Sequence, residues 1–251
     1  MIGRWWTLWL LARKRLESPE SYRAFQFYQG RWLTERLQGL GVPLKESLVL
    51  DLGAGLGGYS LALRAVGAKI VGLDLRPAAD LRSMGVDQVK GEALELPFRC
   101  SSFDGVFCAS LIEHVRDQGR LLLEMRRVLK PGGWAYLSFP PYFSPLGGHQ
   151  FSPFHYLGER VALAIARRRR WWGSSSWVPA EFGTNPASFA DAFGAYGLYP
   201  VTIAKARGLI GRSGFEIRWW GTRFFPVNVA RLPILGEFLS WHVEFLLKPV
   251  G

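Results

Sequence analysis

The middle of the chain alternates between short apolar runs and segments whose apolar positions recur at helical spacing. The run SLVLDL at 47–52 is continuous and apolar, which is typical of a strand buried on both faces of a parallel sheet. Further strands are predicted at 69–74, 86–90, 102–110 and 134–139. Helices are predicted between them at 58–66, 77–84 and 116–130. This alternation predicts an α/β protein with a parallel, doubly wound sheet and right-handed crossovers.

The pattern changes on both sides of this region. Before it, residues 21–40 place aromatic and apolar side chains at three-to-four spacing, which predicts a helix. After it, the chain is rich in Pro, Gly, Ser and aromatic residues, and only 158–170 and 187–197 have a helical pattern. The segments 214–220 and 242–248 predict a closing pair of strands.

Three parts are therefore expected. They are an N-terminal helical extension (1–42), a core (43–140 and 213–251), and a cap or substrate-binding insertion (141–212). No apolar run approaches the roughly 18–20 residues that a membrane-spanning helix needs. The N-terminal stretch MIGRWWTLWLLARKR ends in Arg-Lys-Arg rather than in a small-residue cleavage site, so we expect it to be retained. The two cysteines, Cys100 and Cys108, fit a reducing, cytoplasmic setting and indicate neither a disulfide framework nor a metal site.

A glycine-rich loop follows the first predicted strand. In VLDLGAGLGGYS (49–60), Gly53, Gly55 and Gly58 have the spacing G-x-G-x-x-G, which lets a backbone approach a ligand closely. An NAD site would also place an acid about 20 residues further on, and Asp74 meets that demand. Asp51 distinguishes an NAD site from a site for another ligand, because a carboxylate at the loop would repel the pyrophosphate of NAD. It favours a cationic ligand such as S-adenosylmethionine, although an Asp that only caps the loop remains an alternative.

Four further stretches complete the pattern. They are VGLDLRP (71–77), GEALELPF (91–98), SSFDGVFCASLIEHVRD (101–117) and RRVLKPGGWAYLSFP (126–140). With the glycine loop, they resemble the class I S-adenosylmethionine-dependent methyltransferases, most closely the type 11 group that includes quinone-biosynthesis methyltransferases. The resemblance covers about residues 45–140 and implies a seven-stranded, mostly parallel Rossmann-like sheet with an antiparallel last strand.

The resemblance also implies roles for individual residues. Gly53, Ala54 and Gly55 would lie against the methionine part of the cofactor, and Asp51 would face that part directly or through water. Asp74 would accept hydrogen bonds from both ribose hydroxyls, and Leu75 would lie against the adenine.

The remaining implied contacts come from later in the chain. The family usually has Gly-Asp-Ala where this chain has Gly91, Glu92 and Ala93, so Glu92 would accept from the adenine amino group with a longer side chain. Ala93 and Leu94 would complete the adenine slot. Ser110 would end its strand close to the transferred methyl group.

Methyl transfer requires a positioned nucleophile and, for some acceptors, removal of a proton. His149 and His155 follow the fifth predicted strand, where an acceptor is expected to arrive. Either could be the general base or could orient an acceptor hydroxyl; alternatively, both are loop histidines that bond to the backbone. For His114 we expect a structural or cofactor-side role, and for His242 a structural one.

The basic charge lies mostly outside the central region. The net charge is +4 in residues 1–40, +1 in 41–140 and +6 in 141–251, and only Trp134 of the eleven tryptophans lies in 41–140. Arginine and tryptophan in the flanks, as in Arg167–Arg170 with Trp171 and Trp172, suit an anionic membrane surface. The alternatives are a solvated helix end, tryptophans packed in a core or against a dimer partner, and, ranked lowest, a surface that binds nucleic acid.

We therefore expect a methyltransferase that acts at oxygen or carbon of a small-molecule or lipid-like acceptor, with a possible anionic membrane surface as partner. Three alternatives stay open. They are an RNA or DNA methyltransferase, which we rank low because no nucleic-acid module is recognisable, a non-catalytic binding protein with the cofactor fold, and an NAD enzyme.

Overall fold

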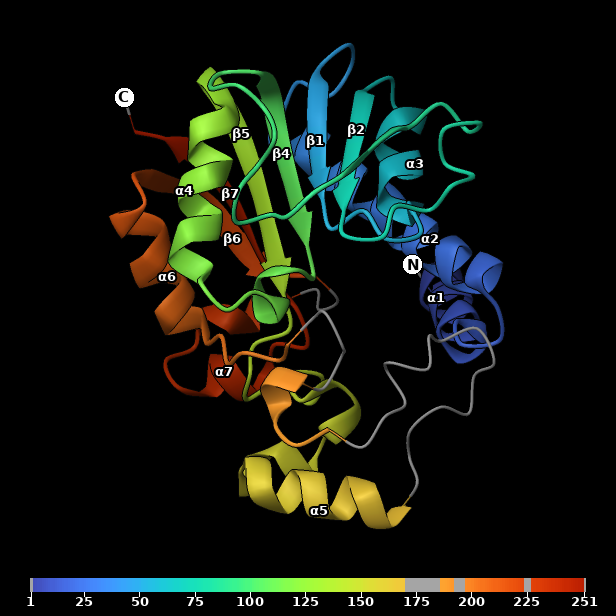
Figure 1. Cartoon of the computed structure of the whole chain (residues 1–251), viewed down its shortest axis with the longest axis vertical. Helices are drawn as coiled ribbons and strands as arrows, with labels where there is room; N and C mark the ends of the chain where they lie inside the picture. Colours follow the sequence, from blue (N-terminus) through green and yellow to red (C-terminus); the bar gives the residue numbers. More distant parts are fainter. Residues whose placement is uncertain (1, 170–185, 192–196, 224–226, 251) are drawn as a thin grey trace. The chain divides into compact units, whose positions relative to one another are not determined.

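A seven-stranded sheet organises the chain in the computed structural model, which describes residues 2–169, 186–191, 197–223 and 227–250. The strand order is β3-β2-β1-β4-β5-β7-β6 (Figure 1). The strands are β1 Leu48–Leu52, β2 Lys69–Asp74, β3 Asp87–Lys90, β4 Phe103–Ala109, β5 Leu129–Phe139, β6 Phe215–Thr222 and β7 Val243–Pro249. The helices are α1 Ile2–Lys14, α2 Pro19–Gly39, α3 Gly58–Ala65, α4 Gln118–Val128, α5 Glu159–Arg169, α6 Ile203–Arg212 and α7 Leu235–Leu239. The predicted α/β fold with an antiparallel closing pair is confirmed.

The chain divides into two compact units, and the division passes through β4 and β5. The first unit holds residues 2–107 and 128–134, and the second holds 108–127, 135–169 and the described residues from 186 onward. Each unit is described by itself below. The division by sequence into extension, core and cap remains a prediction.

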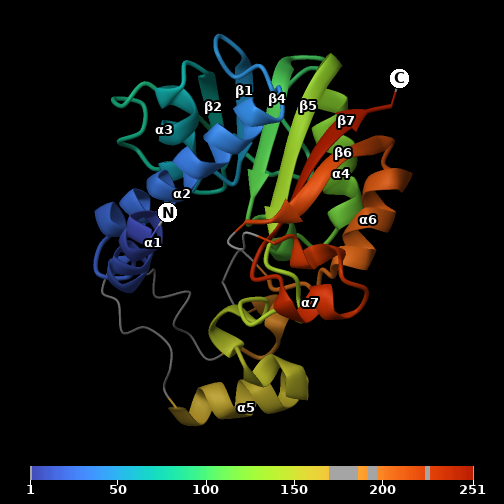
Figure 2. The same ribbon diagram turned by 180° about the vertical axis from the view of Figure 1, so that it is seen from behind.

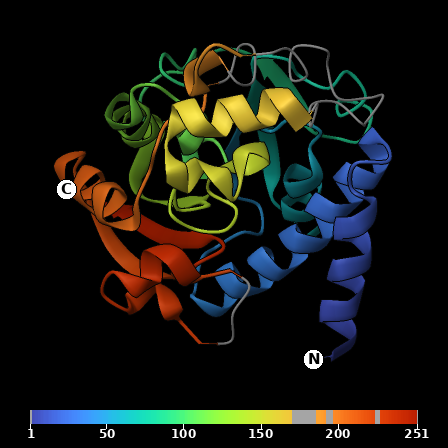
Figure 3. The ribbon, with the colours of Figure 1, turned by 90° about the horizontal axis from the view of Figure 1, so that it is seen from below.

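In the first unit, β1, β2 and β3 pair in parallel, with Leu50 opposite Val71 and Gly72 opposite Gln88. Helix α2 packs against α3 and α1 packs against α2 (Figures 2 and 3). The α2–α3 contact depends on small residues, because a Cβ on Gly30 would lie 2.5 Å from the Ala62 side chain. This packing fixes the start of α3 and hence the loop between β1 and α3.

In the second unit, β7 runs antiparallel to both β5 and β6, with Phe245 opposite Leu137 on one side and Trp220 on the other. Helices α4 and α6 cover the same face of these strands (Figure 1). After β5, the chain forms 3₁₀ helices at His149–Phe151 and Phe154–Leu157 and then α5. These elements share a small hydrophobic core, in which Phe151, Leu163 and Phe189 are buried. The segment after β5 is therefore packed independently of the sheet core.

Several predicted elements differ from the structure. The predicted helix at 77–84 is wrong, because these residues form turns after Pro77. The predicted helix at 187–197 appears only as a 3₁₀ helix at Phe189–Asp191, and its residues 192–196 lie outside the described chain. Strand β5 begins at Leu129, five residues before the predicted strand. Helices α6 and α7 were not predicted. No helix in the described part of the chain is long and apolar enough to cross a membrane.

Candidate active site

The loop between β1 and α3 is built on left-handed glycines. Gly53, Gly55 and Gly57 have φ angles of 73°, 52° and 77°, a region that other residues rarely adopt. Gly57 is also the N-cap of α3, and a Cβ there would lie 2.3 Å from the Leu81 side chain. The third left-handed glycine is thus Gly57, which the sequence reasoning missed, although the alternation of glycine at 53, 55 and 57 signals it.

The loop is held from α2 and flanked by a buried acid. The Arg23 Nε atom donates to the Leu56 carbonyl oxygen at 2.7 Å. Asp51, in β1, is only 2% exposed and accepts a hydrogen bond from the Ser60 hydroxyl of α3. Burial raises the pKa of Asp51 to about 7, against the lowering effect of Ser60. A cation at the loop would therefore stabilise the charged form of this carboxylate.

Asp74 ends β2 and contacts the same loop. Its two carboxylate oxygens accept from the backbone N–H groups of Gly55 and Arg76, each at 2.9 Å. These two bonds fix the orientation of the Asp74 carboxylate beside the glycine loop. The structure thus brings Asp51, Gly53, Ala54, Gly55 and Asp74 together in the first unit, and their roles towards a cofactor remain predictions.

The residues that follow β3 bond to the end of β2. The Gly91 N–H donates to the Asp74 carbonyl oxygen at 3.1 Å. Glu92 is exposed and forms a β-bridge with Glu95. Leu75, Ala93 and Leu94 are each half-buried. An exposed acid beside half-buried apolar side chains can accept from an amino group while the apolar surface covers a flat ring. The adenine roles of these residues remain predictions.

The second unit carries a separate polar cluster at the ends of β4 and β7. Ser110 has a left-handed φ of 56°, and its hydroxyl lies 3.1 Å from His242 Nε2. Its backbone N–H donates to the Ser138 carbonyl oxygen at 2.8 Å. A non-glycine residue in this conformation costs roughly 1 kcal/mol or more, so the surrounding structure holds Ser110 in place. Burial, and to a lesser degree Arg223, lowers the pKa of His242 well below its ordinary value.

Three residues of this unit lie close together in the fold, and two of them follow shortly after Ser110 in the sequence. Glu113 and His114 lie in the 3₁₀ helix Ile112–His114 after β4, and His149 begins the 3₁₀ helix after β5. His149 Nε2 is 3.8 Å from Glu113 Oε1, and the His114 and His149 rings are 4.9 Å apart. Burial raises the pKa of Glu113 to about 8 and lowers the pKa of both histidines. A histidine with a lowered pKa is a weak base, so His149 is better suited to orient an acceptor hydroxyl than to deprotonate it.

His155 is placed differently. It is 1% exposed, and its Nε2 atom lies 2.9 Å from the Tyr142 carbonyl oxygen. Its Nδ1 atom lies 3.4 Å from the Ser152 hydroxyl, and a Cβ on Gly148 would collide with its ring. Both ring nitrogens are thus engaged within its own segment. This geometry favours the alternative in which His155 holds the loop that carries His149.

A buried ion pair supports the same unit. Arg223 is 4% exposed, and its Nε atom lies 3.2 Å from the Glu244 carboxylate, which is completely buried. The Arg223 guanidinium also donates to the hydroxyls of Tyr136 and Ser138. The backbone N–H of Arg223 donates to the His242 carbonyl oxygen at 3.0 Å. Such a pair is stable only when its remaining polar atoms are satisfied. No sequence motif predicted this ion pair.

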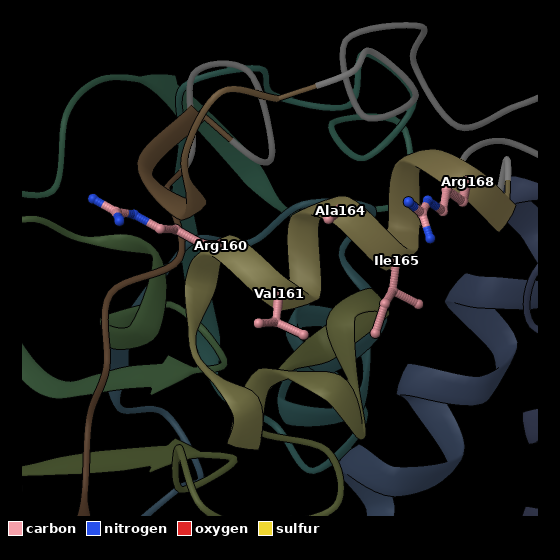
Figure 4. Close-up of a pocket in the computed structure, with 5 residues that line it drawn as sticks. All are labelled: Arg160, Val161, Ala164, Ile165 and Arg168. Atoms are coloured by element: carbon pink, nitrogen blue, oxygen red, sulfur yellow. The ribbon is translucent and has the colours of Figure 1, made fainter.

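A shallow depression of about 320 Å³ lies on the surface of α5. It is lined by Arg160, Val161, Ala164, Ile165 and Arg168, with the two arginines at the ends of the row (Figure 4). All five side chains come from one helix and none belongs to the polar clusters above. It is therefore a feature of the surface rather than part of the active site.

The sheet topology and the left-handed glycine loop are typical of α/β proteins that bind a cofactor at the loop after the first strand. Residues 50–137 match a family model described as a methyltransferase domain. An uncharacterized methyltransferase of Mycolicibacterium vanbaalenii is 30% identical over 210 residues, which are 80% of this chain and 76% of that protein. One from Mycobacterium marinum is 28% identical, with coverage of 97% and 94%. The chain belongs to the class I S-adenosylmethionine-dependent methyltransferases, in the type 11 group.

Solved structures share the fold. A possible histamine N-methyltransferase of Thermotoga maritima is 20% identical, with a TM-score of 0.52 and coverage of 92% of this chain and 95% of that one. The 1,6-didemethyltoxoflavin-N1-methyltransferase of Burkholderia thailandensis, solved with its substrate and S-adenosylhomocysteine, is 16% identical with a TM-score of 0.54, covering 90% and 79%. At these identities the likeness concerns the fold alone.

Proposed function

We propose that this methyltransferase acts at a hydroxyl or an activated carbon of a small, lipid-like acceptor. The observation that carries the proposal is an exposed apolar surface on the second unit, here named the apolar rim. It consists of Phe143, Leu146, Leu232, Ile234, Leu235, Phe238, Leu239 and Trp241, each at least 36% exposed. Apolar surface of this extent is typical of a binding site.

The apolar rim is continuous with the polar cluster of the same unit. The His149 N–H donates to the Leu146 carbonyl oxygen at 3.0 Å, so the two residues share one turn. The Phe143 ring stacks on Phe238 of α7 at 5.5 Å, which joins the segment after β5 to the segment 232–241. An acceptor with an apolar body and one polar end would match an apolar surface beside His149 and Glu113.

The first unit would bind the cofactor. Asp51 would face the cationic methionine part, Gly53, Ala54 and Gly55 would approach it through the backbone, and Asp74 would accept from the ribose hydroxyls. Leu75 would contact the adenine, as would the stretch 92–94. This assignment is supported by the buried acid beside a loop of left-handed glycines, since a phosphate ligand would be repelled there.

In the proposed reaction, a lone pair of the acceptor attacks the methyl carbon in line with the carbon–sulfur bond. That bond breaks, and its electron pair passes to sulfur. Because the sulfonium already activates the methyl group, the protein's task is to hold the acceptor atom about 3–3.5 Å from the methyl carbon. Ser110 and His149 would orient an acceptor hydroxyl, and its proton would leave to water.

Incubation with methyl-labelled S-adenosylmethionine tests the proposal. The acceptor mixtures are a total lipid extract, a deproteinised metabolite fraction and total RNA, and label is expected in the organic phase. Leu239→Ser in the apolar rim is expected to raise KM for the acceptor while the Kd of S-adenosylhomocysteine stays unchanged. Leu123→Ser on α4 is the matched control, because Leu239 and Leu123 are 46% and 47% exposed. Label in RNA would support the nucleic-acid alternative, and cofactor binding without any transfer would support a binding protein.

We further propose that the protein is cytoplasmic and that it associates reversibly with anionic membrane surfaces. Trp5, Trp6 and Trp9 of α1 are 40%, 59% and 45% exposed, and the Arg13 guanidinium lies 4.8 Å from the Trp9 ring centre. Exposed indole rings beside cations suit a lipid interface. On α5, the row from Arg160 to Arg168 adds apolar side chains between two cations (Figure 4). Arg170, Trp171 and Trp172, on which part of this prediction rested, lie outside the described residues.

Vesicle sedimentation tests the association. Binding to anionic vesicles is expected to weaken as salt rises and to be small on neutral vesicles, because each basic residue near the surface contributes about 1 kcal/mol. Replacing Trp6 and Trp9 with alanine is expected to weaken it at every salt concentration. If the intact protein stays in the supernatant with anionic vesicles at low salt, the proposal is wrong.

A further inference from the structure

Glu113 is a buried acid whose carboxylate lacks compensation. It is 2% exposed, and neither carboxylate oxygen has a hydrogen-bond partner among the described residues. Its backbone is fixed, because its carbonyl oxygen accepts from the Tyr199 N–H at 2.8 Å. A buried carboxyl group whose oxygens lack hydrogen bonds is costly to the fold in its charged form and, to a lesser degree, in its neutral form. A structural role gives no reason to keep such a group, whereas a ligand that binds to it would.

His114, the next residue, has an imidazole ring whose tautomer suits binding of the same ligand. His114 Nδ1 lies 2.8 Å from the Gly197 carbonyl oxygen. Since a carbonyl oxygen only accepts, the hydrogen of the neutral imidazole is on Nδ1, and the lone pair is on Nε2. A backbone carbonyl that fixes this tautomer is the usual arrangement around a histidine that coordinates a metal ion.

The third residue comes from a different element. His149 has a left-handed φ of 49°, a conformation that is costly for histidine and that often occurs at functional sites. Its Nε2 atom lies 3.8 Å from Glu113 Oε1. One ligand atom from each of Glu113, His114 and His149 lies within 4.8 Å of the others. A tetrahedral ion with bonds of about 2.0–2.1 Å would place its ligands about 3.3 Å apart, so small side-chain rotations would complete the site.

We propose that Glu113, His114 and His149 bind a divalent transition-metal ion of the zinc type. Two imidazoles and one carboxylate suit such an ion, whereas Mg²⁺ and Ca²⁺ prefer oxygen ligands throughout. Three protein ligands leave one coordination position open, as in zinc sites that bind a substrate. The ion would also supply the positive charge that the Glu113 carboxylate lacks.

The charged groups around the cluster are compatible with a bound metal ion. Arg223 is the cation whose field reaches Glu113, and its guanidinium is paired with Glu244 at 3.2 Å. The pair is close to neutral as a whole, so it opposes a bound cation only weakly. His242, the residue before β7, interacts electrostatically with His149 and is uncharged because burial lowers its pKa.

The open coordination position would let the ion bind the methyl acceptor. This inference rests on the function proposed above. A hydroxyl oxygen of the acceptor would coordinate there, beside the apolar rim that receives the rest of the acceptor. Coordination lowers the pKa of a bound hydroxyl. The hydroxyl proton would then leave to water, because the lone pair of His149 would be held by the ion.

Metal binding is measured on the full chain without cofactor or acceptor, so the result does not depend on the proposed reaction. The protein is dialysed against a chelator and titrated with Co²⁺, which reports coordination by its visible absorption, and with Zn²⁺ against a chromogenic chelator. One ion per chain is expected. Glu113→Gln and His149→Ala are each expected to weaken Zn²⁺ binding by about 100-fold or more, since each removes one of three ligands. Cys100→Ser, which removes an exposed thiol outside the cluster, is expected to leave binding unchanged.

Thermal unfolding keeps the test decisive if a variant folds poorly. In chelator, Glu113→Gln is expected to unfold at the same temperature as the wild type or higher, because a neutral amide replaces a carboxyl group whose charged form is disfavoured by burial. With Zn²⁺, only the wild type is expected to gain stability. The proposal is overturned if the wild type binds no stoichiometric ion, if Glu113→Gln binds Zn²⁺ as tightly as the wild type, or if Cys100→Ser abolishes the absorption.

Discussion

Replacing Asp51 with asparagine is expected to stabilise the cofactor-free protein at alkaline pH and to weaken cofactor binding. Asp51 is 2% exposed, and burial raises its pKa from 3.8 to about 7. The hydrogen bond from Ser60 lowers the pKa and the nearby Asp74 carboxylate raises it, but both effects are smaller than that of burial. Asparagine has almost the same shape and keeps an oxygen that can accept from Ser60.

The expected magnitude follows from the shift of about 3 pKa units, which corresponds to about 4 kcal/mol. Because the pKa of this acid is higher in the folded state, its contribution to stability is complete below about pH 4 and is lost as the pH rises through about 7. The charged carboxylate therefore costs the fold about 4 kcal/mol at pH 8 and about 2 kcal/mol at pH 5. Asp51→Asn is expected to recover most of that difference.

Urea unfolding of both proteins at pH 5 and pH 8 measures this gain. Asp104→Asn is the control of opposite sign, because the Asp104 carboxylate accepts from Lys130 Nζ and the Leu48 N–H, and its pKa is lowered. Calorimetric titration with S-adenosylhomocysteine is expected to show binding weakened by about 1.5–3 kcal/mol in Asp51→Asn, the range for a hydrogen bond to a charged group. A variant that is no more stable than the wild type at pH 8, or that binds the ligand equally well, would refute the reasoning.

Three further outcomes are expected. Asp74→Ala should weaken S-adenosylhomocysteine binding by about 1.5–3 kcal/mol in a folded protein, measured by calorimetry; unchanged affinity would exclude the ribose role. Gly57→Ala should cost more stability than Gly132→Ala in urea unfolding, since both have a φ of 77° but only the former places a Cβ against Leu81; the control alone should cost about 1 kcal/mol, and equal costs would contradict the steric argument. His149→Ala should lower turnover roughly 100-fold with cofactor affinity unchanged, and full activity would remove His149 from the acceptor side.

The sequence was sufficient for the part of the fold that depends on local pattern. Continuous apolar runs predicted β1 and its neighbours because a strand buried on both faces needs no alternation. The glycine loop was predictable because only glycine reaches left-handed φ without cost. Local pattern was misleading at 77–84, where good helix formers follow Pro77 yet form turns. Helix α6 was missed although Thr202 caps it by accepting from the Lys205 N–H, because glycines in its sequence weaken the helical pattern.

The acceptor side was less predictable, because its residues meet only in the folded chain. Glu113 and His149 are 36 residues apart in the sequence, and their 3.8 Å approach depends on how the segment after β5 folds back. His155 has the same local signal as His149, a histidine in an aromatic loop, but the fold engages both of its ring nitrogens. Residue type and spacing therefore identified the candidates, and only tertiary structure separated them.

The buried acids of this protein differ in whether the fold supplies each of them with a partner, and this difference separates structural from functional roles. Glu244 is fully buried, and the fold places Arg223 against it at 3.2 Å. Asp51 and Glu113 are buried nearly as deeply, yet Asp51 has a single hydroxyl partner and the Glu113 carboxylate has none among the described residues. A fold that pairs Glu244 with a cation and leaves Asp51 and Glu113 without one loses stability at those two positions. That loss is understandable if each acid is completed by a cation that arrives later, the cofactor at Asp51 and a metal ion at Glu113.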